Sequence, residues 1–193
     1  SGVQFKQSRD YRTNRPFVNH SIQKLVASGR ALVFSFDEVA GLPEMAERLH
    51  LQPVVRAEKH NDFVGRICLN CTSRAGPARH ALNSYADVEA MDIYRPLVPN
   101  PLVTDLCNLA VDVRDRHGAK VELSGATVDI RTAYEQYFHS GDVPLLFGTV
   151  VEVECDGVWK KVVVAWVGGC YGFVRGGYAY SEIQQFLDYE HNR

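Results

Sequence analysis

The chain has 193 residues, of which 46% are hydrophobic and 23% are charged, and its formal net charge is −2 at pH 7. This length is enough for one domain or two small lobes with a buried core, and the composition excludes a disordered or fibrous protein. No run of about 18 apolar residues occurs, which excludes a membrane-spanning helix, and the weak negative charge argues against nucleic-acid binding over the whole surface. The polar start shows no signal-peptide pattern, so we expect an intracellular protein, cytoplasmic or nuclear.

The cysteines support a reducing compartment. There are five of them, at irregular spacings, which is not the pattern of a disulfide framework. Cys68 and Cys71 form a C-x-x-C pair, but a zinc site needs a second matching pair, and the sequence has none. Buried free thiols are therefore the expectation, with zinc as the alternative.

The first residues of the chain are basic. Six lysines and arginines stand among the first thirty residues against Asp10 alone. Residues 1–20 show no hydrophobic periodicity, so we interpret them as a basic N-terminal arm that wraps or frays. Its charges either face phosphate groups or are simply solvated.

Three short elements are predicted next: a helix over 21–29, a strand over 31–36 and a helix that starts at Leu42-Pro43. The apolar residues expected on or near the inner faces of the two helices are Ile22, Leu25, Val26, Met45, Leu49 and Leu51.

Residues 52–70 are predicted to form a β-hairpin, because two apolar arms flank the turn-forming residues at 60–62. Lys59 ends the first arm and Arg66 lies on the second. A mobile hairpin with two cations can close over a polyphosphate and neutralise it. The alternative is a surface hairpin whose charges only keep the protein soluble.

A helix and an acidic strand follow. Asn100 and Pro101 are typical of a helix start, and Gly118 of its end. Residues 126–130 then form an apolar, β-branched run that ends near Asp129, and we expect the helix to pack on the sheet that carries it. A carboxylate on a rigid strand end is a natural magnesium ligand, because hard cations prefer charged oxygen.

The last third of the chain contains a second hairpin and a glycine-rich turn. Strands over 150–155 and 158–167 flank Asp156-Gly157, a strong two-residue turn signal. Trp159 and Trp166 lie on these arms and are interpreted as packing residues. The glycines over 168–177 predict a turn where the backbone closely approaches another group, followed by a helix over 178–190.

These motifs, in this order, resemble the reverse transcriptase family, and the retrotransposon type in particular. The resemblance covers residues 20–190 and comprises the basic hairpin, Leu82-Asn83, the helix that ends at Gly118, the segment Asp-Ile-Arg-Thr-Ala-Tyr over 129–134, and the glycine turn. In that turn Gly177 stands where the family has proline. The resemblance implies an α+β fold with the fingers and part of the palm of a right-hand polymerase, in which antiparallel hairpins pack with helices. Residues 1–20 would be the basic arm, 21–98 the fingers-like region and 99–193 the partial palm.

The resemblance also implies roles for individual residues. Asp129 is the expected catalytic residue, and it would hold Mg²⁺ together with the carbonyl of Ile130. The expected nucleotide-binding residues are Lys59, Arg66, Ala133, Tyr134, Tyr171 and Gly172. The implied partners are an RNA or DNA template-primer and a deoxynucleoside triphosphate, with no membrane.

The family's second acidic motif, an aromatic-x-Asp-Asp hairpin, does not occur in these 193 residues. Two-metal phosphoryl transfer needs carboxylates from both motifs. We therefore expect a fragment of an RNA-directed DNA polymerase that does not polymerise by itself. Two alternatives remain open: a domesticated, non-catalytic domain that binds nucleic acid or a protein, and an unrelated α+β interaction domain.

Overall fold

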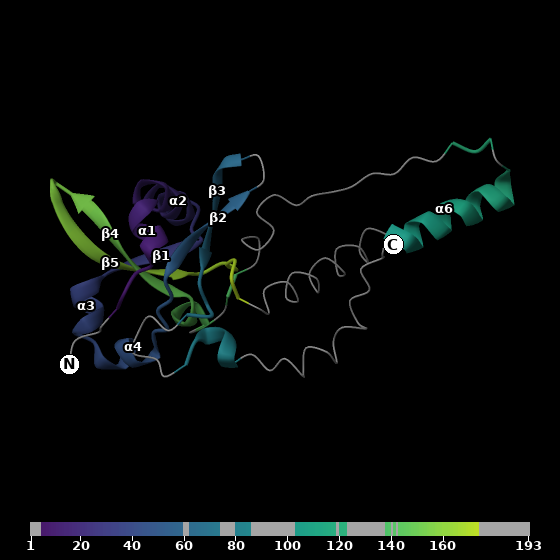
Figure 1. Ribbon diagram of the computed structural model, residues 1–193. Coiled ribbons are helices and arrows are strands. Elements are labelled where there is room, and N and C mark those ends of the chain that lie inside the picture. The colour runs from purple at the N-terminus through teal and green to yellow at the C-terminus, as the bar shows by residue number, and fades with distance from the viewer. Residues whose placement is uncertain are drawn as a thin grey trace.

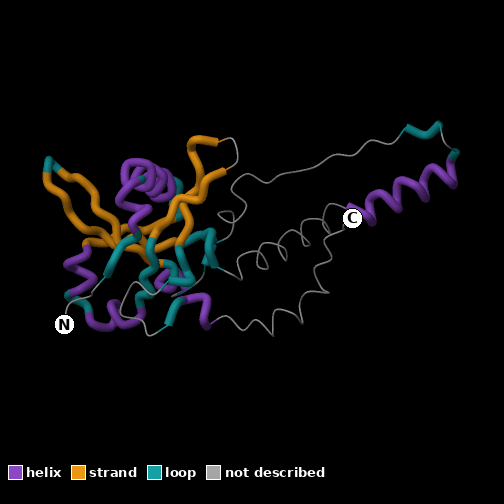
Figure 2. Tube along the Cα trace, in the orientation of Figure 1, coloured by secondary structure: helices purple, strands orange, loops and turns teal. Residues whose placement is uncertain are grey.

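The computed structural model describes residues 5–59, 62–73, 80–85, 103–118, 120–122, 138–139, 141 and 143–173. These residues form short helices and two antiparallel sheets (Figures 1 and 2). The fold is therefore α+β, as the sequence predicted.

The larger sheet has three antiparallel strands in the order β1-β5-β4. They are β1 (Ala31–Ser35), β4 (Gly148–Cys155) and β5 (Val158–Trp166). In the central strand β5, the successive apolar residues 163–166 are all buried. Successive side chains point to opposite faces of a sheet, so both faces of β5 are covered there.

The turn between β4 and β5 is the predicted two-residue turn. Asp156 and Gly157 have φ angles of 52° and 76°, and two successive positive φ angles are what a type I′ hairpin turn requires.

The second sheet is the predicted basic hairpin, β2 (Val54–Lys59) paired with β3 (Asp62–Leu69). Its register shifts between Ala57 and Lys59. Gly65 lies opposite this irregularity with a φ of 64°, and a Cβ atom there would lie 2.7 Å from the carbonyl oxygen of Ala57. Glycine is therefore needed for the hairpin to bend at this point.

The helices are short apart from α2 and α6. Their bounds are α1 Arg9–Thr13, α2 Arg15–Ala27, α3 Phe36–Ala40, α4 Pro43–Arg48 and α6 Val103–His117, with 3₁₀ turns η1 Leu82–Tyr85 and η4 Val143–Leu146. The predicted start of α4 at Pro43 and end of α6 at Gly118, with a φ of 91°, are confirmed.

The N-terminal segment was expected to wrap or fray, and its described part, residues 5–20, is mostly helical and does not fray. Ser8 caps α1 by accepting a hydrogen bond from the amide of Tyr11, and α2 begins at Arg15 rather than at residue 21. Tyr11 is 2% exposed and Val18 is fully buried. Asn14 ends α1 and precedes α2, so Tyr11 and Val18 lie on different helices. For this reason their burial does not appear as a helical periodicity in the sequence.

Side chains of this N-terminal segment cover the open edge of β4. The Gln7 amide donates to the carbonyl of Val150 (2.9 Å), and the hydroxyl of Tyr11 accepts from the amide of Glu152 (2.8 Å). Asn19 donates to the carbonyl of Glu152 (2.7 Å). These bonds satisfy backbone groups that an edge strand leaves unpaired.

The same segment also covers the edge of β2. The amide of Val54 donates to Gln7 (2.9 Å), and Ser8 donates to the carbonyl of Val54 (2.6 Å). The amide of Arg56 donates to the carboxylate of Asp10 (2.5 Å). Residues 7–19 therefore join the two sheets, and Figure 1 shows α1 and α2 between the β4–β5 and β2–β3 hairpins.

The buried side chains of the described residues form two clusters. The larger lies among α1, α2, β3 and the β5 strand, and the smaller lies where α3 and the segment after α4 meet the sheet. Buried members include Tyr11, Val18, Leu69, Val151, Val164 and Trp166 in the first, and Val39, Leu49, Leu51 and Val163 in the second. The expected burial of Leu25, Leu49 and Leu51 is confirmed, whereas Val26 is exposed.

Helix α6 was expected to pack on the sheet that carries Asp129, but that segment lies outside the described residues, so the expectation stays a prediction. Leu109 is 60% exposed, and none of the side chains described along this helix is buried. In Figure 1 α6 lies apart from both sheets.

Candidate functional site

The glycine turn lies against the end of β3. The amide of Leu69 donates to the carbonyl of Tyr171 over 2.9 Å, which joins segments that are a hundred residues apart along the chain. Gly172 has a φ of +107°, and a Cβ atom there would lie 1.8 Å from the carbonyl oxygen of Leu69. Only glycine permits both this backbone conformation and this approach.

The turn also contacts η1. The side-chain amide of Asn83 donates to the carbonyl of Gly172 over 3.1 Å, and the backbone amide of Asn83 donates to the carbonyl of Cys71 over 2.9 Å. Asn83 therefore connects η1 both to the residues that follow β3 and to the glycine turn. Its neighbour Leu82 is buried in the larger core cluster, which holds η1 in place.

The hairpin cation Arg66 reaches the same place. Its guanidinium carbon lies 5.2 Å from the centre of the Tyr171 ring, within the range of a cation–π interaction. Arg66 is exposed and Tyr171 is half-buried, so the ring orients the cation while leaving it open to solvent. An oriented guanidinium is suited to bind phosphate or carboxylate oxygens.

The structure thus brings together three of the predicted nucleotide-binding residues, Arg66, Tyr171 and Gly172. The backbone of Lys59 pairs with Asp62 at the tip of the hairpin, but its side chain lies outside the described part. The other predicted site residues, Asp129, Ile130, Ala133 and Tyr134, lie outside the described residues.

Metal-binding clusters are not found in the part of the chain that the structure describes. No group of three or more histidine, cysteine, aspartate or glutamate side chains there is arranged to hold an ion. The five cysteines are free. The predicted magnesium ligands Asp129 and Ile130 lie in a segment to which this finding does not extend.

Two contacts at this site were not predicted from the sequence as site features. In the sequence, Asn83 was noted only as part of the Leu82-Asn83 motif. Its hydrogen bond goes to the carbonyl of Gly172, which lies far along the chain, so no local pattern could predict it. Cys71 and Cys170 are buried in the same core cluster. The neighbouring Cys71 thiol and burial raise the pKa of Cys170 well above its ordinary value, and burial also raises the pKa of Cys68, against a smaller lowering by Arg66.

One cation of the basic N-terminal segment is engaged within the protein. Arg15 forms an ion pair with Glu152 over 3.1 Å, and its guanidinium carbon lies 4.0 Å from the centre of the Trp159 ring. Trp166 is buried, so its predicted packing role is confirmed, whereas Trp159 is exposed and packs with Arg15. Arg15 therefore contributes less to a phosphate-facing surface than its position in the sequence suggested.

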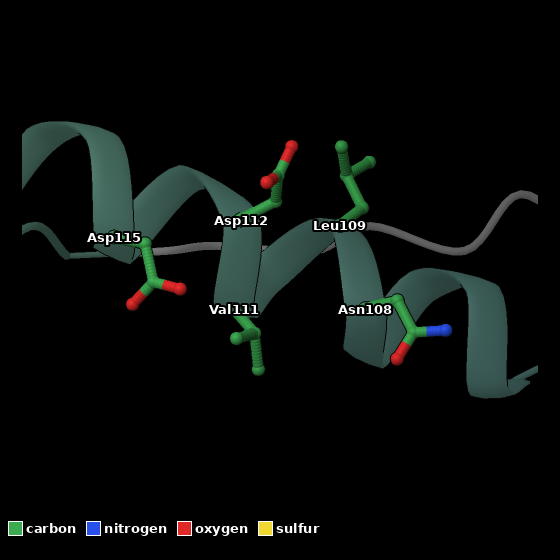
Figure 3. A pocket seen from close by; sticks show the side chains of 5 residues that line it. All are labelled: Asn108, Leu109, Val111, Asp112 and Asp115. Carbon is green, nitrogen blue, oxygen red and sulfur yellow. The ribbon is translucent and has the colours of Figure 1, made fainter.

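A shallow depression runs along α6, but its geometry does not suggest a binding site. It is lined by Asn108, Leu109, Val111, Asp112 and Asp115. Figure 3 shows Leu109 and Asp112 pointing to one side of the helix and the other three side chains to another, so they do not converge. Asp112 is also paired with Arg116 one turn later.

Comparison with known proteins identified no relative. No family model matches the chain, and no curated protein and no solved structure is significantly similar to it. Among the helices that the structure describes, none has the length and apolar composition needed to cross a bilayer.

Proposed function

We propose that this chain comprises the fingers and the first part of the palm of an RNA-directed DNA polymerase of retrotransposon type. The observation that supports the proposal best is the meeting of Arg66, Asn83 and the Tyr171–Gly172 turn. These residues come from three separate stretches that carry the resemblance to reverse transcriptases.

Each group at this site has a chemical use in nucleotide binding. Arg66, oriented by Tyr171 and exposed, would neutralise a triphosphate together with Lys59. The space left by the missing side chain of Gly172 is occupied by the Leu69 carbonyl, so Gly172 would act by docking the turn that places the Tyr171 ring beside Arg66.

The remaining roles come from the resemblance. Asp129 and the carbonyl of Ile130 would hold Mg²⁺, which would screen the charge of the triphosphate. Ala133 and Tyr134 would lie under the sugar, and the Tyr134 ring would exclude a 2′-hydroxyl group. Because the 193 residues contain no second acidic motif, the isolated chain should bind a nucleotide without extending a primer.

A direct test is the binding of a fluorescent deoxynucleoside triphosphate, followed by anisotropy with and without Mg²⁺. Arg66→Ala should weaken binding about tenfold to a hundredfold, since a charge-assisted hydrogen bond contributes about 1.5–3 kcal/mol. Asp129→Asn should remove the dependence on Mg²⁺. The matched control is Lys24→Ala, which removes one exposed cation from α2 and should leave binding unchanged.

The results also separate the alternatives. Binding of nucleic acid that falls steeply with salt, without triphosphate binding, would favour a domesticated non-catalytic domain. Two observations favour such a non-catalytic domain: the net charge of −2 and the ion pair of Arg15 with Glu152. If neither ligand binds at low salt, the polymerase proposal is wrong and the interaction domain is favoured. Templated primer extension by this chain would contradict the predicted need for a second acidic motif.

A further inference from the structure

Strand β1 is an edge of the larger sheet, and its strand order β1-β5-β4 leaves one side of β1 unpaired. The amide of Val167 donates to the carbonyl of Arg30 over 2.9 Å. In an antiparallel ladder, successive residues direct their backbone groups alternately toward and away from the neighbouring strand. Leu32 therefore bonds toward β5, whereas Ala31 and Val33 present their amides and carbonyls on the other side.

The outward backbone groups of Ala31 and Val33 have no hydrogen-bond partner among the described residues. The edges of β4 and β2 differ, because residues 7–19 cover them. Edge strands that stay unpaired are commonly protected by proline, by charged side chains or by a bulge. Strand β1 has the sequence Ala-Leu-Val-Phe-Ser, with neither proline nor charge, and its register with β5 is regular.

The side chains beside this edge are apolar and exposed. Leu32 is 49% exposed and Val33 is 45% exposed. Neighbouring residues of a strand point to opposite faces of the sheet, so apolar surface is open on both faces. A strand added at the edge would cover both side chains at once, whereas a helix packed on one face would cover only one of them.

We propose that β1 is a dimerisation edge, at which β1 of a second copy of this chain pairs antiparallel about a two-fold axis through Val33. In this register Val33 lies opposite Val33 of the second copy, and the two residues exchange two backbone hydrogen bonds. Leu32 lies opposite Phe34, and Ala31 lies opposite Ser35. The two three-stranded sheets become one continuous sheet.

Charge favours a second copy over an unrelated strand. Lys24 and Arg30 precede β1, and the exposed acids Asp37 and Glu38 follow it at the start of α3. A strand with a basic start and an acidic end is complementary to itself when antiparallel, because each basic end meets the acidic end of the other copy. Parallel pairing would place like charges side by side. This contact does not depend on the proposed polymerase function.

The test is sedimentation velocity of the full chain over a range of concentrations. We expect a weak dimer with a dissociation constant of about 10–100 µM, because two five-residue strands bury less than the about 1,200 Å² of a stable interface. Val33→Lys should raise this constant about tenfold or more, since it places two like charges opposite each other. Val158→Lys, the same change at an exposed valine at the start of β5, should leave it unchanged.

Hydrogen exchange of single amides identifies the strand that pairs. At a total concentration tenfold above the dissociation constant, about four-fifths of the chains are dimeric, so exchange of the Val33 amide should be about fivefold slower than at high dilution. The Leu32 amide bonds toward β5 in both states and is the internal control, whose exchange should not slow in this way.

Four results would overturn the proposal. The first is a chain that stays monomeric, with Val33 exchange independent of concentration. The second is a dimer that leaves the Val33 amide unprotected, and the third is a Val33→Lys variant that is folded and dimerises as the unsubstituted chain does. The fourth is slow exchange of Val33 already in the monomer, which would show that a segment of the same chain covers the edge. The exchange experiment uses the unsubstituted chain, so it decides even if Val33→Lys fails to fold.

Discussion

Leu69 and Gly172 approach each other so closely that a Cβ atom on Gly172 would lie 1.8 Å from the carbonyl oxygen of Leu69. The contact joins the end of the basic hairpin to the glycine turn, and it brings Arg66 over the ring of Tyr171. The arrangement of the candidate site therefore depends on one residue without a side chain.

Replacing Gly172 by alanine should destabilise the protein by about 2–5 kcal/mol, because both the positive φ and the overlap with Leu69 oppose a Cβ atom. The measurement is the free energy of unfolding from urea denaturation. Gly157→Ala is the matched control: its φ is 76° but no heavy atom lies within 4 Å of the new Cβ, so a loss of about 1–2 kcal/mol is expected. Equal losses would mean that the turn is not docked on β3.

The variant Asn83→Asp should loosen the glycine turn. A carboxylate cannot donate to the carbonyl of Gly172 and instead repels it, so we expect a loss of about 1–2 kcal/mol in the free energy of unfolding. Hydrogen exchange at the Leu69 amide should also become faster. Asn108→Asp on the exposed surface of α6 makes the same chemical change and should alter neither quantity. Unchanged exchange in Asn83→Asp would show that this hydrogen bond does not hold the turn.

Tyr11→Phe tests whether the N-terminal segment stabilises the sheet edge. The variant keeps the ring but leaves the amide of Glu152 without the hydroxyl that accepts its hydrogen bond, at a cost of about 1–3 kcal/mol in the free energy of unfolding. Tyr85→Phe is the control, because that side chain is exposed and should change stability by less than about 0.5 kcal/mol. If both variants are equally stable, the segment does not contribute through this bond.

The protein should lose stability as the pH falls below about 6.5, the ordinary pKa of histidine. Burial lowers the pKa of His50 and of His139, which stacks on Phe147 with ring centres 4.7 Å apart. In this range the unfolded chain takes up protons that the folded protein does not, so the free energy of unfolding decreases with decreasing pH.

The measurement is urea denaturation at about pH 7.5 and about pH 5.5, on either side of the histidine titration. His139→Phe keeps a ring on Phe147 and should reduce the difference in the free energy of unfolding between the two pH values. His117→Gln changes an exposed residue of α6 and should leave the difference as it is in the unsubstituted protein. A His139→Phe variant with the full pH dependence would exclude His139 as a source of the effect.

The sequence by itself determined the local elements. Both hairpins were predicted because apolar, β-branched arms flank turn-forming residues, and at Asp156-Gly157 the turn type follows from residues that tolerate a positive φ. The start of α4 at Pro43 and the end of α6 at Gly118 were predicted for the same reason, since proline and glycine act on the backbone at their own positions.

Only the tertiary structure decided which segments meet. Residues 7–19 form hydrogen bonds to two strand edges, and Tyr11 is buried there. The partners lie more than forty residues away along the chain, so no local pattern predicts these contacts. The docking of Gly172 on Leu69 has the same origin. The sequence indicated that the backbone there must approach something closely, because glycine has no side chain, but the identity of that group depends on how β3 and the turn pack together.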